Sequence, residues 1–279
     1  MKGIKIGKKT FATDHCHVMG ILNVTPDSFS DGGSYKTMDD VLYRVETMIA
    51  EGAAIIDVGG ESTRPGYTMI SDEEEISRVC PVISAIKESF DIPVSLDTYK
   101  SSVARAGIAS GADLINDIWG LQYDEAMGTI VAEAKVAYCL MHNRSERRET
   151  KVLEDFLRDM QEDIQRAKAC GMMEDNIIYD PGIGFAKSQE QNLELIGILD
   201  KYVATGIPIL LGTSRKSVIN YVLDLPVDKR LEGTLATTAE AVFAGVCFVR
   251  VHDVKENVRF IQMLERTREK WVRSWNRFL

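Results

Sequence analysis

The 279-residue sequence has no run of 18 apolar residues, no low-complexity tract and no glycine- or serine-rich linker. It therefore offers no candidate for a membrane span or a flexible tether. Its first residues lack the apolar core of a signal peptide, so we expect a cytoplasmic protein. Prolines number only 7 and 45% of the residues are hydrophobic, which is enough to bury one large core. We therefore expect a single domain over residues 1–279.

Cysteine is scarce and basic charge is in deficit. The 5 cysteines are odd in number and show no CxxC spacing, which argues against a disulfide framework or a zinc site. The formal net charge of -9 disfavours nucleic acid as a partner. If the substrate is anionic, an acidic protein must gather its arginine, lysine or histidine side chains at one place.

Short apolar runs alternate with longer amphipathic ones along the chain. The runs predict eight strands over residues 18–22, 54–58, 93–96, 113–115, 136–141, 176–179, 208–211 and 247–251. The amphipathic stretches predict helices over residues 38–51, 72–90, 101–110, 124–134, 154–171, 189–204, 231–245 and 255–275. Residues 4–11 predict a hairpin that plugs the bottom of the core. Eight such repeats favour an α/β fold of the TIM (β/α)8 barrel type. A doubly wound sheet usually has five or six strands and a glycine-rich nucleotide turn.

Enzymes with this barrel build their sites just beyond the carboxyl ends of the strands. There the sequence has Asp97, Asn116, Asp180 and Lys216. Buried carboxylates and amides are costly to desolvate, and a flat heterocycle rich in N–H donors would compensate them. Lys216 could donate to such a ring or pair with an aspartate as a structural salt bridge. Asp97 and Asn116 are also of the residue types that cap helices.

The last strand supplies a candidate anion site. Arg250 and His252 are two residues apart, so on a strand they point to the same side and suit phosphate oxygens. The alternative is that they pair with Asp253 or with a helix. In a closed barrel the first and last strands are neighbours, which places Asn23 beside them. Mg2+ would bridge Asn23 and the phosphate oxygens.

Residues 20–33 comprise the end of the first strand and a long loop that turns polar at Asn23. Such a loop is costly to order and is usually kept where it covers or carries a site. Asp27 and Asp31 supply hard oxygen ligands, and Phe29 supplies an apolar surface. On these residues alone, a solvated surface loop is an equal alternative.

Eight segments resemble the dihydropteroate synthases, a family of pterin-binding enzymes, over nearly the whole chain. They are GILNVTPDSFSDGG, DVGGESTRPG, SLDTYK, INDIWG, LMHNR, DPGIGFAKS, LLGTSRKS and FVRVHDV. The wider pterin-binding family includes corrinoid methyltransferases, which lack the first loop and the GTSRKS turn in this form. Ala186 stands where the family commonly has glycine, and Val218 where a bulkier residue is frequent. Neither touches a group with an expected role.

The resemblance implies a transferase of folate biosynthesis and a sulfonamide target. It would join 6-hydroxymethyl-7,8-dihydropterin diphosphate to p-aminobenzoate by a dissociative route, giving 7,8-dihydropteroate and pyrophosphate. The implied pterin ligands are Asp97, Asn116, Asp180 and Lys216, and the diphosphate ligands are Asn23, Thr63, Arg250 and His252. The implied p-aminobenzoate residues are Phe29, Thr63, Pro65, Phe185, Lys216 and Ser217. Catalytic roles fall on Asp27, Asp31, Asp97 and Lys216, with Mg2+ on Asn23.

The family also suggests a homodimer through the late helices, around residues 235–243. A corrinoid methyltransferase subunit and a non-catalytic paralogue remain the alternatives.

Overall fold

The computed structural model describes residues 3–25, 37–61, 69–148 and 152–275, without the side chains of residues 269–275. Eight parallel strands form one sheet in the order β8-β7-β6-β5-β4-β3-β10-β9. Their bounds are β3 His17–Asn23, β4 Ile55–Gly59, β5 Val94–Asp97, β6 Leu114–Asp117, β7 Ala137–Met141, β8 Ile177–Asp180, β9 Leu210–Leu211 and β10 Phe248–Val251. A parallel bridge between Tyr179 and Ile209 joins β8 to β9 and closes the ring. The predicted TIM barrel and its eight strands are confirmed.

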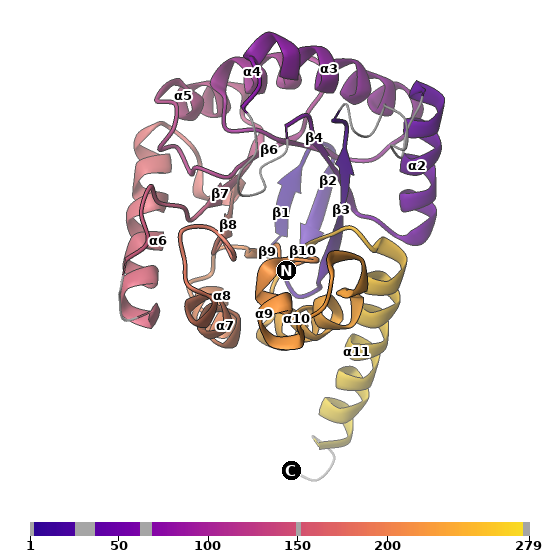
Figure 1. Cartoon of the computed structure of the whole chain (residues 1–279), viewed down its shortest axis with the longest axis vertical. Helices are drawn as coiled ribbons and strands as arrows, with labels where there is room; N and C mark the ends of the chain where they lie inside the picture. Colours follow the sequence, from indigo (N-terminus) through magenta and orange to yellow (C-terminus); the bar gives the residue numbers. More distant parts are fainter. Residues whose placement is uncertain (1–2, 26–36, 62–68, 149–151, 276–279) are drawn as a thin grey trace.

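Helices surround the strands on the outside of the ring (Figure 1). They are α2 Met38–Glu51, α3 Asp72–Ser89, α4 Ser101–Ala109, α5 Ala126–Ala134, α6 Val152–Ala169, α7 Gln189–Gly197, α8 Leu199–Val203, α9 Ser217–Leu223, α10 Leu231–Ala244 and α11 Val254–Trp275, with short 3-10 turns η1 Glu174–Asn176 and η2 Val227–Lys229. The single helix expected over residues 189–204 is in fact α7 and α8, which meet at Ile198. Helix α9 was not expected, and α11 runs on past the barrel (Figure 1).

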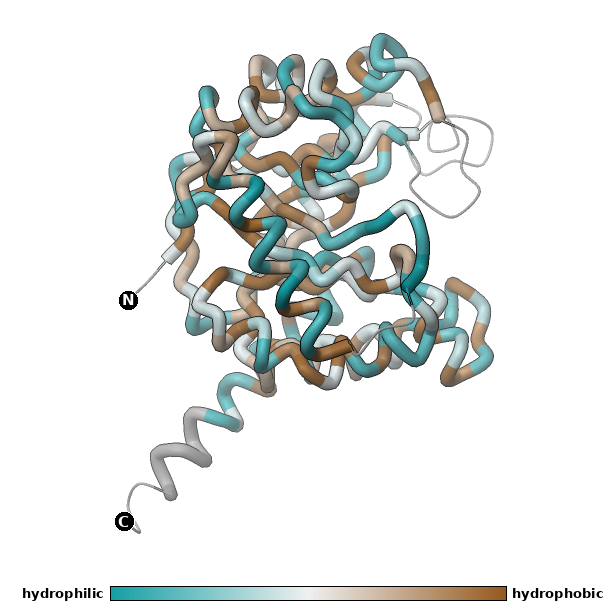
Figure 2. The backbone as a smooth tube through the Cα atoms, turned by 90° about the vertical axis from the view of Figure 1, so that its left-hand side faces the viewer, coloured by the Kyte–Doolittle hydropathy of each residue, from teal (hydrophilic) through white to brown (hydrophobic). Residues whose placement is uncertain are grey.

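The core has two parts, one inside the ring and one between the ring and the helices. Inside, the hairpin of β1 Gly3–Ile6 and β2 Lys9–Ala12 packs Ile4, Ile6 and Phe11 against Met19 and Phe248. This confirms the predicted plug at the amino end of the barrel. Between the layers, the apolar sides of the helices cover the outward side chains of the strands. In Figure 2, brown segments of the tube accordingly gather inside the molecule, and the outer helices alternate between teal and brown.

Local signals start and stop the helices. The Thr37 side chain caps α2 in a capping box with Asp40, and Gly52 ends that helix in the left-handed region at φ 102°. Ser188 and Gln191 form a second capping box, which fixes the start of α7 after the β8 turn. Among the residues described, we find no helix with the length and apolarity needed to cross a membrane.

The strand register brings distant residues into one row. Asn23 pairs with Gly59, Gly59 with Asp97, and Asp97 with Asn116. These four residues end β3, β4 and β5 and lie near the end of β6, so they share the carboxyl rim of the barrel. The sheet therefore assembles a polar row from positions spread over more than 90 residues of sequence.

Candidate active site at the carboxyl end of the barrel

The mouth of the barrel is lined by buried polar side chains. Asp97, Asn116 and Asp180 are only 8%, 4% and 5% exposed. Lys216 comes from the turn between β9 and α9 and lies close to Asp180, since a β-carbon built on Gly212 would stand 3.5 Å from Asp180 Oδ2 and 3.8 Å from Lys216 Nζ. The structure thus brings together the four residues expected to bind a donor-rich ring.

Arg250 occupies the floor of this mouth. Its Nε donates to Asp57 Oδ2 and its Nη2 to Asp97 Oδ2, both at 2.6 Å. It lies opposite Met19 in the register, four residues before Asn23. The alternative pairing of Arg250 with Asp253 is wrong, because Arg250 turns into the barrel.

Asp57 is a site residue that sequence reasoning missed. Its side chain is fully buried on β4, two residues before Gly59 and therefore on the same inward side. A carboxylate at an inward position of an otherwise apolar strand was the available signal. Asp57 is placed beside Asp97 through their common partner Arg250, so the mouth has three carboxylates rather than two.

The carboxylates differ from free aspartate in their ionisation. Burial raises the pKa of Asp97, Arg250 opposes that rise, and Asp57 adds to it. Burial also raises the pKa of Asp180, which Lys216 and the Gly182 amide oppose. Within the described part of the chain, Asp97 Oδ1 and Asp57 Oδ1 have no hydrogen-bond partner. A ligand with N–H groups would satisfy such an acceptor at the mouth.

Lys216 links two turns of the site. Its Nζ donates to the Ile183 carbonyl oxygen at 2.5 Å and lies 4.8 Å from the centre of the Phe185 ring. Burial lowers the pKa of Lys216 to about 8, although Asp180 opposes the shift. No salt bridge of 4.0 Å or less joins Lys216 to an aspartate among the described residues. The alternative of a purely structural ion pair for Lys216 is therefore not what the geometry shows.

The turn after β8 is tightly built. Gly182 donates its amide to Asp180 Oδ1 at 2.7 Å and has φ +68°. A β-carbon there would stand 2.0 Å from the His142 carbonyl oxygen, so only glycine fits. Ala186, where glycine is common in the family, also takes a positive φ of 46°. This turn presents Phe185 beside Lys216, as expected for a ring-binding wall.

The turn after β9 is fixed from three sides. The Arg215 guanidinium donates to both oxygens of Asp253, with 3.0 Å between Nε and Oδ2. The Arg215 amide donates to Thr234 Oγ1 at 3.1 Å, and Arg230 donates to the Arg215 carbonyl at 2.9 Å. These contacts hold Arg215 at φ +59° and so set the direction of the next residue, Lys216.

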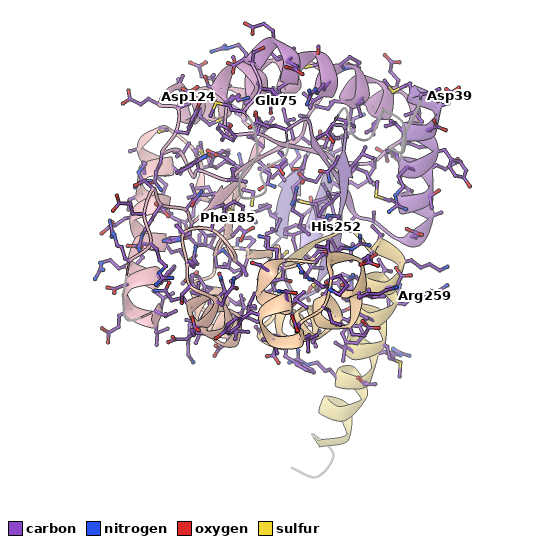
Figure 3. The ribbon with its side chains drawn as sticks, viewed as in Figure 1. Asp39, Glu75, Asp124, Phe185, His252 and Arg259 are labelled. Carbon is purple, nitrogen blue, oxygen red and sulfur yellow. The ribbon has the colours of Figure 1, made fainter. Side chains whose placement is uncertain are left out.

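His252 and Ser217 lie at the edges of the mouth. His252 follows β10, and its amide donates to Ser214 Oγ at 3.2 Å, while Nδ1 lies 2.9 Å from the same hydroxyl. Ser217 begins α9 and accepts a hydrogen bond from Gln189 at 3.2 Å. Phe185 and His252 are labelled in Figure 3 and come from different loops on the two sides of the site. The expected residues Asp27, Phe29, Asp31, Thr63 and Pro65 lie outside the described residues.

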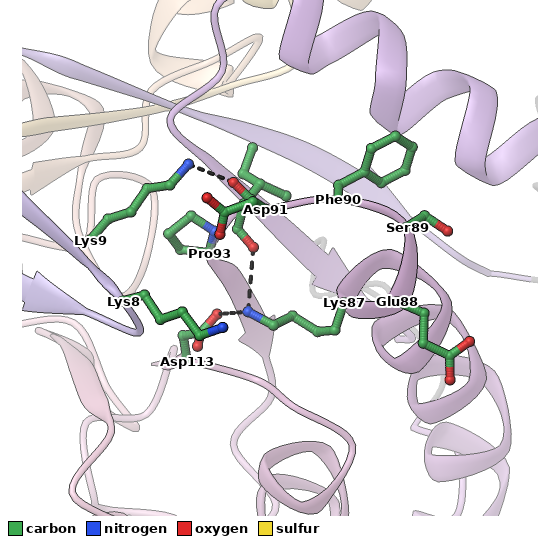
Figure 4. A pocket seen from close by; sticks show the side chains of 10 residues that line it. Lys8, Lys9, Lys87, Glu88, Ser89, Phe90, Asp91, Pro93 and Asp113 are labelled. Carbon is green, nitrogen blue, oxygen red and sulfur yellow. Dashed lines mark hydrogen bonds and ion pairs between the residues drawn. The ribbon is translucent and has the colours of Figure 1, made fainter.

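A cavity of about 280 Å³ lies at the other end of the barrel (Figure 4). It lies where the hairpin turn meets the starts of β5 and β6. Lys9 donates to the Asp91 carbonyl at 2.6 Å, and Lys87 pairs with Asp113 at 2.7 Å. Its charges are thus largely balanced within the protein, and none of the site residues lines it.

Comparisons with known proteins agree with this site. Residues 19–252 match the model of the pterin binding enzyme family. A dihydropteroate synthase of Clostridium beijerinckii is 54% identical over 264 residues, covering 94% of this chain and 98% of the relative. The Xanthomonas albilineans dihydropteroate synthase with 4-aminobenzoic acid has a TM-score of 0.90 at 35% identity, covering 96% of this chain and 98% of that one. The Coxiella burnetii enzyme in complex with pteroic acid has a TM-score of 0.86 at 38% identity, covering 96% and 99%. The chain therefore belongs to the pterin binding enzyme family, among its dihydropteroate synthases.

Proposed function

We propose that this chain condenses 6-hydroxymethyl-7,8-dihydropterin diphosphate with p-aminobenzoate, giving 7,8-dihydropteroate and pyrophosphate. The observation that carries the proposal is the buried row of Asp97, Asn116 and Asp180 with Lys216 at its edge. Two carboxylates can accept the amino and ring N–H groups of a pterin, the amide can both donate and accept, and the lysine can donate to the ring. The relatives named for dihydropteroate synthase support the same reaction.

The charge of the mouth favours a dissociative route. Three carboxylates, those of Asp57, Asp97 and Asp180, face the two cations Arg250 and Lys216. The negative groups therefore outnumber the positive ones by one above about pH 7, the value to which burial raises the pKa of Asp97. The C–O bond to the diphosphate breaks with its electron pair, and a cation develops at the pterin methylene carbon. The negative charge of the mouth stabilises this developing cation. The aniline nitrogen of p-aminobenzoate then forms the C–N bond and loses a proton to solvent, so no covalent enzyme intermediate is needed.

The leaving diphosphate would be held by His252, Arg250 and Asn23, with Thr63 expected from the sequence. Asn23 ends β3 at the rim and offers one neutral hard oxygen, which suits Mg2+ because this ion commonly keeps waters and substrate phosphates as its other ligands. Among the described residues there is no group of three or more His, Cys, Asp or Glu that could hold a metal alone. A bound Mg2+ would neutralise charge on the leaving diphosphate.

The p-aminobenzoate would lie against Phe185, near Lys216 and Ser217. The Phe185 ring is already paired with the Lys216 ammonium, so a second aromatic ring and its carboxylate find an apolar face and a cation side by side. Replacing Phe185 by alanine should raise the KM for p-aminobenzoate.

Release of pyrophosphate tests the proposal directly. The protein, Mg2+, the dihydropterin diphosphate and p-aminobenzoate are mixed, and pyrophosphate and dihydropteroate are measured together. We expect equal amounts of both products, and no dihydropteroate when p-aminobenzoate is omitted. Methyl transfer to a corrinoid protein without pyrophosphate release would instead support the methyltransferase alternative.

We also infer a homodimer. Tyr221 and Val222 on α9 and Phe243 on α10 are 54%, 58% and 52% exposed, which places three large apolar side chains on the surface of neighbouring helices. Phe243 lies at the end of the stretch 235–243 expected to pack against a second copy. Analytical ultracentrifugation measures the mass in solution. The cytoplasmic location stays a prediction.

A further inference from the structure

Lys187 binds the backbone of the turn after β8 through its ammonium group. Its Nζ donates to three backbone carbonyl oxygens, those of Gly182 at 2.9 Å, Phe185 at 3.0 Å and His142 at 3.2 Å. An ammonium group has three N–H donors, and here each has a partner. The contacts join the β8–α7 turn to the end of β7, two segments that are 40 residues apart in the sequence.

This arrangement is costly for the lysine. Burial lowers its pKa well below the ordinary value, against the attraction of Asp180. Among the described residues no carboxylate lies within 4 Å of its Nζ, so the carbonyl dipoles and the Phe156 ring, 5.3 Å away, provide the compensation. Three convergent acceptors favour the protonated form, since a neutral amine has only two N–H donors. The Lys187 ammonium group is thus held by main-chain carbonyl oxygens, as a small monovalent cation would be.

Residues with positive φ shape the turn that presents these carbonyls to Lys187. Gly182 at φ +68° sits against the His142 carbonyl, and Ala186 at φ +46° turns the chain back toward α7. Without the ammonium, three converging carbonyl oxygens would lose the donor they share, although the Gly182 oxygen would keep the Phe185 amide as a second donor, at 3.1 Å. One of the three carbonyl groups belongs to Phe185, whose ring faces Lys216. A relaxation of the carbonyls would therefore move the Phe185 ring.

We propose that Lys187 is a positioning residue for p-aminobenzoate: its ammonium group fixes the backbone of Gly182–Phe185 and so holds the Phe185 ring in place. The inference rests on the proposed role of Phe185 as a wall of the p-aminobenzoate site. Lys187 itself touches no substrate. Its main effect is expected on the second substrate, although the same turn also contacts two pterin residues, Asp180 through the Gly182 amide and Lys216 through the Ile183 carbonyl.

A double-mutant cycle tests the coupling between the two residues. Lys187→Met keeps the apolar stem and removes the charge, and we expect the KM for p-aminobenzoate to rise about tenfold, as a misplaced site wall predicts, with kcat changed less than about twofold. In a Phe185→Ala background the same substitution should add nothing. The matched control is Lys201→Met, an exposed lysine paired with Asp200 on α8, which should leave KM unchanged.

Chemical rescue separates positioning from folding. In Lys187→Ala, added propylammonium replaces the deleted atoms and should restore the KM, whereas propanol should not. If Lys187→Met does not fold, Lys187→Arg keeps the charge but cannot direct three donors from one nitrogen, and its KM should rise. An unchanged KM in a folded Lys187 variant, or additive effects in the cycle, overturns the inference. An unchanged KM in Phe185→Ala alone would instead refute the proposed role of Phe185.

Discussion

A buried ionic cluster behind the site gives a sharp prediction for stability. Lys100 Nζ pairs with Glu61 Oε2 at 2.9 Å and with Glu75 Oε2 at 2.7 Å. The three side chains are 4%, 3% and 1% exposed. The same ammonium donates to the Ile70 carbonyl, and Tyr99 donates to Glu61 at 2.5 Å. Lys100→Met would leave two carboxylates buried without their cation.

Breaking a buried ion pair from one side costs about 3–5 kcal/mol, so we expect Lys100→Met to lose about 4 kcal/mol of the free energy of unfolding. At about 2 °C per kcal/mol for a chain of this size, Tm should fall by about 8 °C. Urea unfolding followed by circular dichroism measures the change. A loss below about 1 kcal/mol would show that the cluster is solvated, and would refute the reasoning.

Glu75→Gln is the matched control, because the cluster contains two carboxylates and one ammonium. This variant removes one carboxylate and leaves the other paired with Lys100. Burial raises the pKa of Glu75, whereas for Glu61 the hydrogen bonds from Tyr99 and Lys100 outweigh burial and lower it. A carboxyl with a raised folded-state pKa stabilises the fold at low pH, and that stability is lost as the pH rises through the folded pKa. Glu75→Gln should therefore cost little at neutral pH and flatten this part of the pH dependence.

Three further predictions concern the site. Ala186→Gly should stabilise the protein by about 0.5–1 kcal/mol in urea unfolding, and a loss of stability would contradict this. Relief of the left-handed conformation at φ +46° contributes about 1–2 kcal/mol, which exceeds the entropy cost of glycine. Because burial lowers the pKa of Lys216 to about 8, the charge of Lys216 is present below that pH and lost above it. Calorimetry should therefore show pterin binding that weakens as the pH rises through about 8, and Lys216→Arg should remove this pH dependence. Asp57→Asn should cost about 3 kcal/mol in the same unfolding assay because Arg250 loses a buried counter-charge, whereas an unchanged stability would mean that Asp97 alone compensates Arg250.

The fold was largely readable because each strand is a short apolar run and each long helix has a wide amphipathic face. Helix α9 escaped prediction because seven residues are too few to show a helical period. The break at Ile198 escaped for a related reason. Gly197 directly precedes it, but one glycine is tolerated within a helical pattern, and the apolar pattern continues across it.

The site was readable where a polar residue ended a strand. Asp97, Asn116 and Asp180 were found because the barrel fold places strand ends together. Asp57 was missed because it stands inside a strand, and its importance appears only when Arg250 reaches it across the barrel. Pairing of Arg215 with Asp253 likewise depends on two segments that the sequence does not relate.

The central claim is that the buried row at the barrel mouth binds a pterin, and calorimetry of 6-hydroxymethyl-7,8-dihydropterin tests it most directly. The titration compares the native protein with Asp180→Asn, and with Asp200→Asn as an exposed control on α8. A hydrogen bond to a charged group contributes about 2 kcal/mol, so Asp180→Asn should weaken Kd roughly thirtyfold while Asp200→Asn leaves it unchanged. Equal affinity for all three proteins would contradict the account.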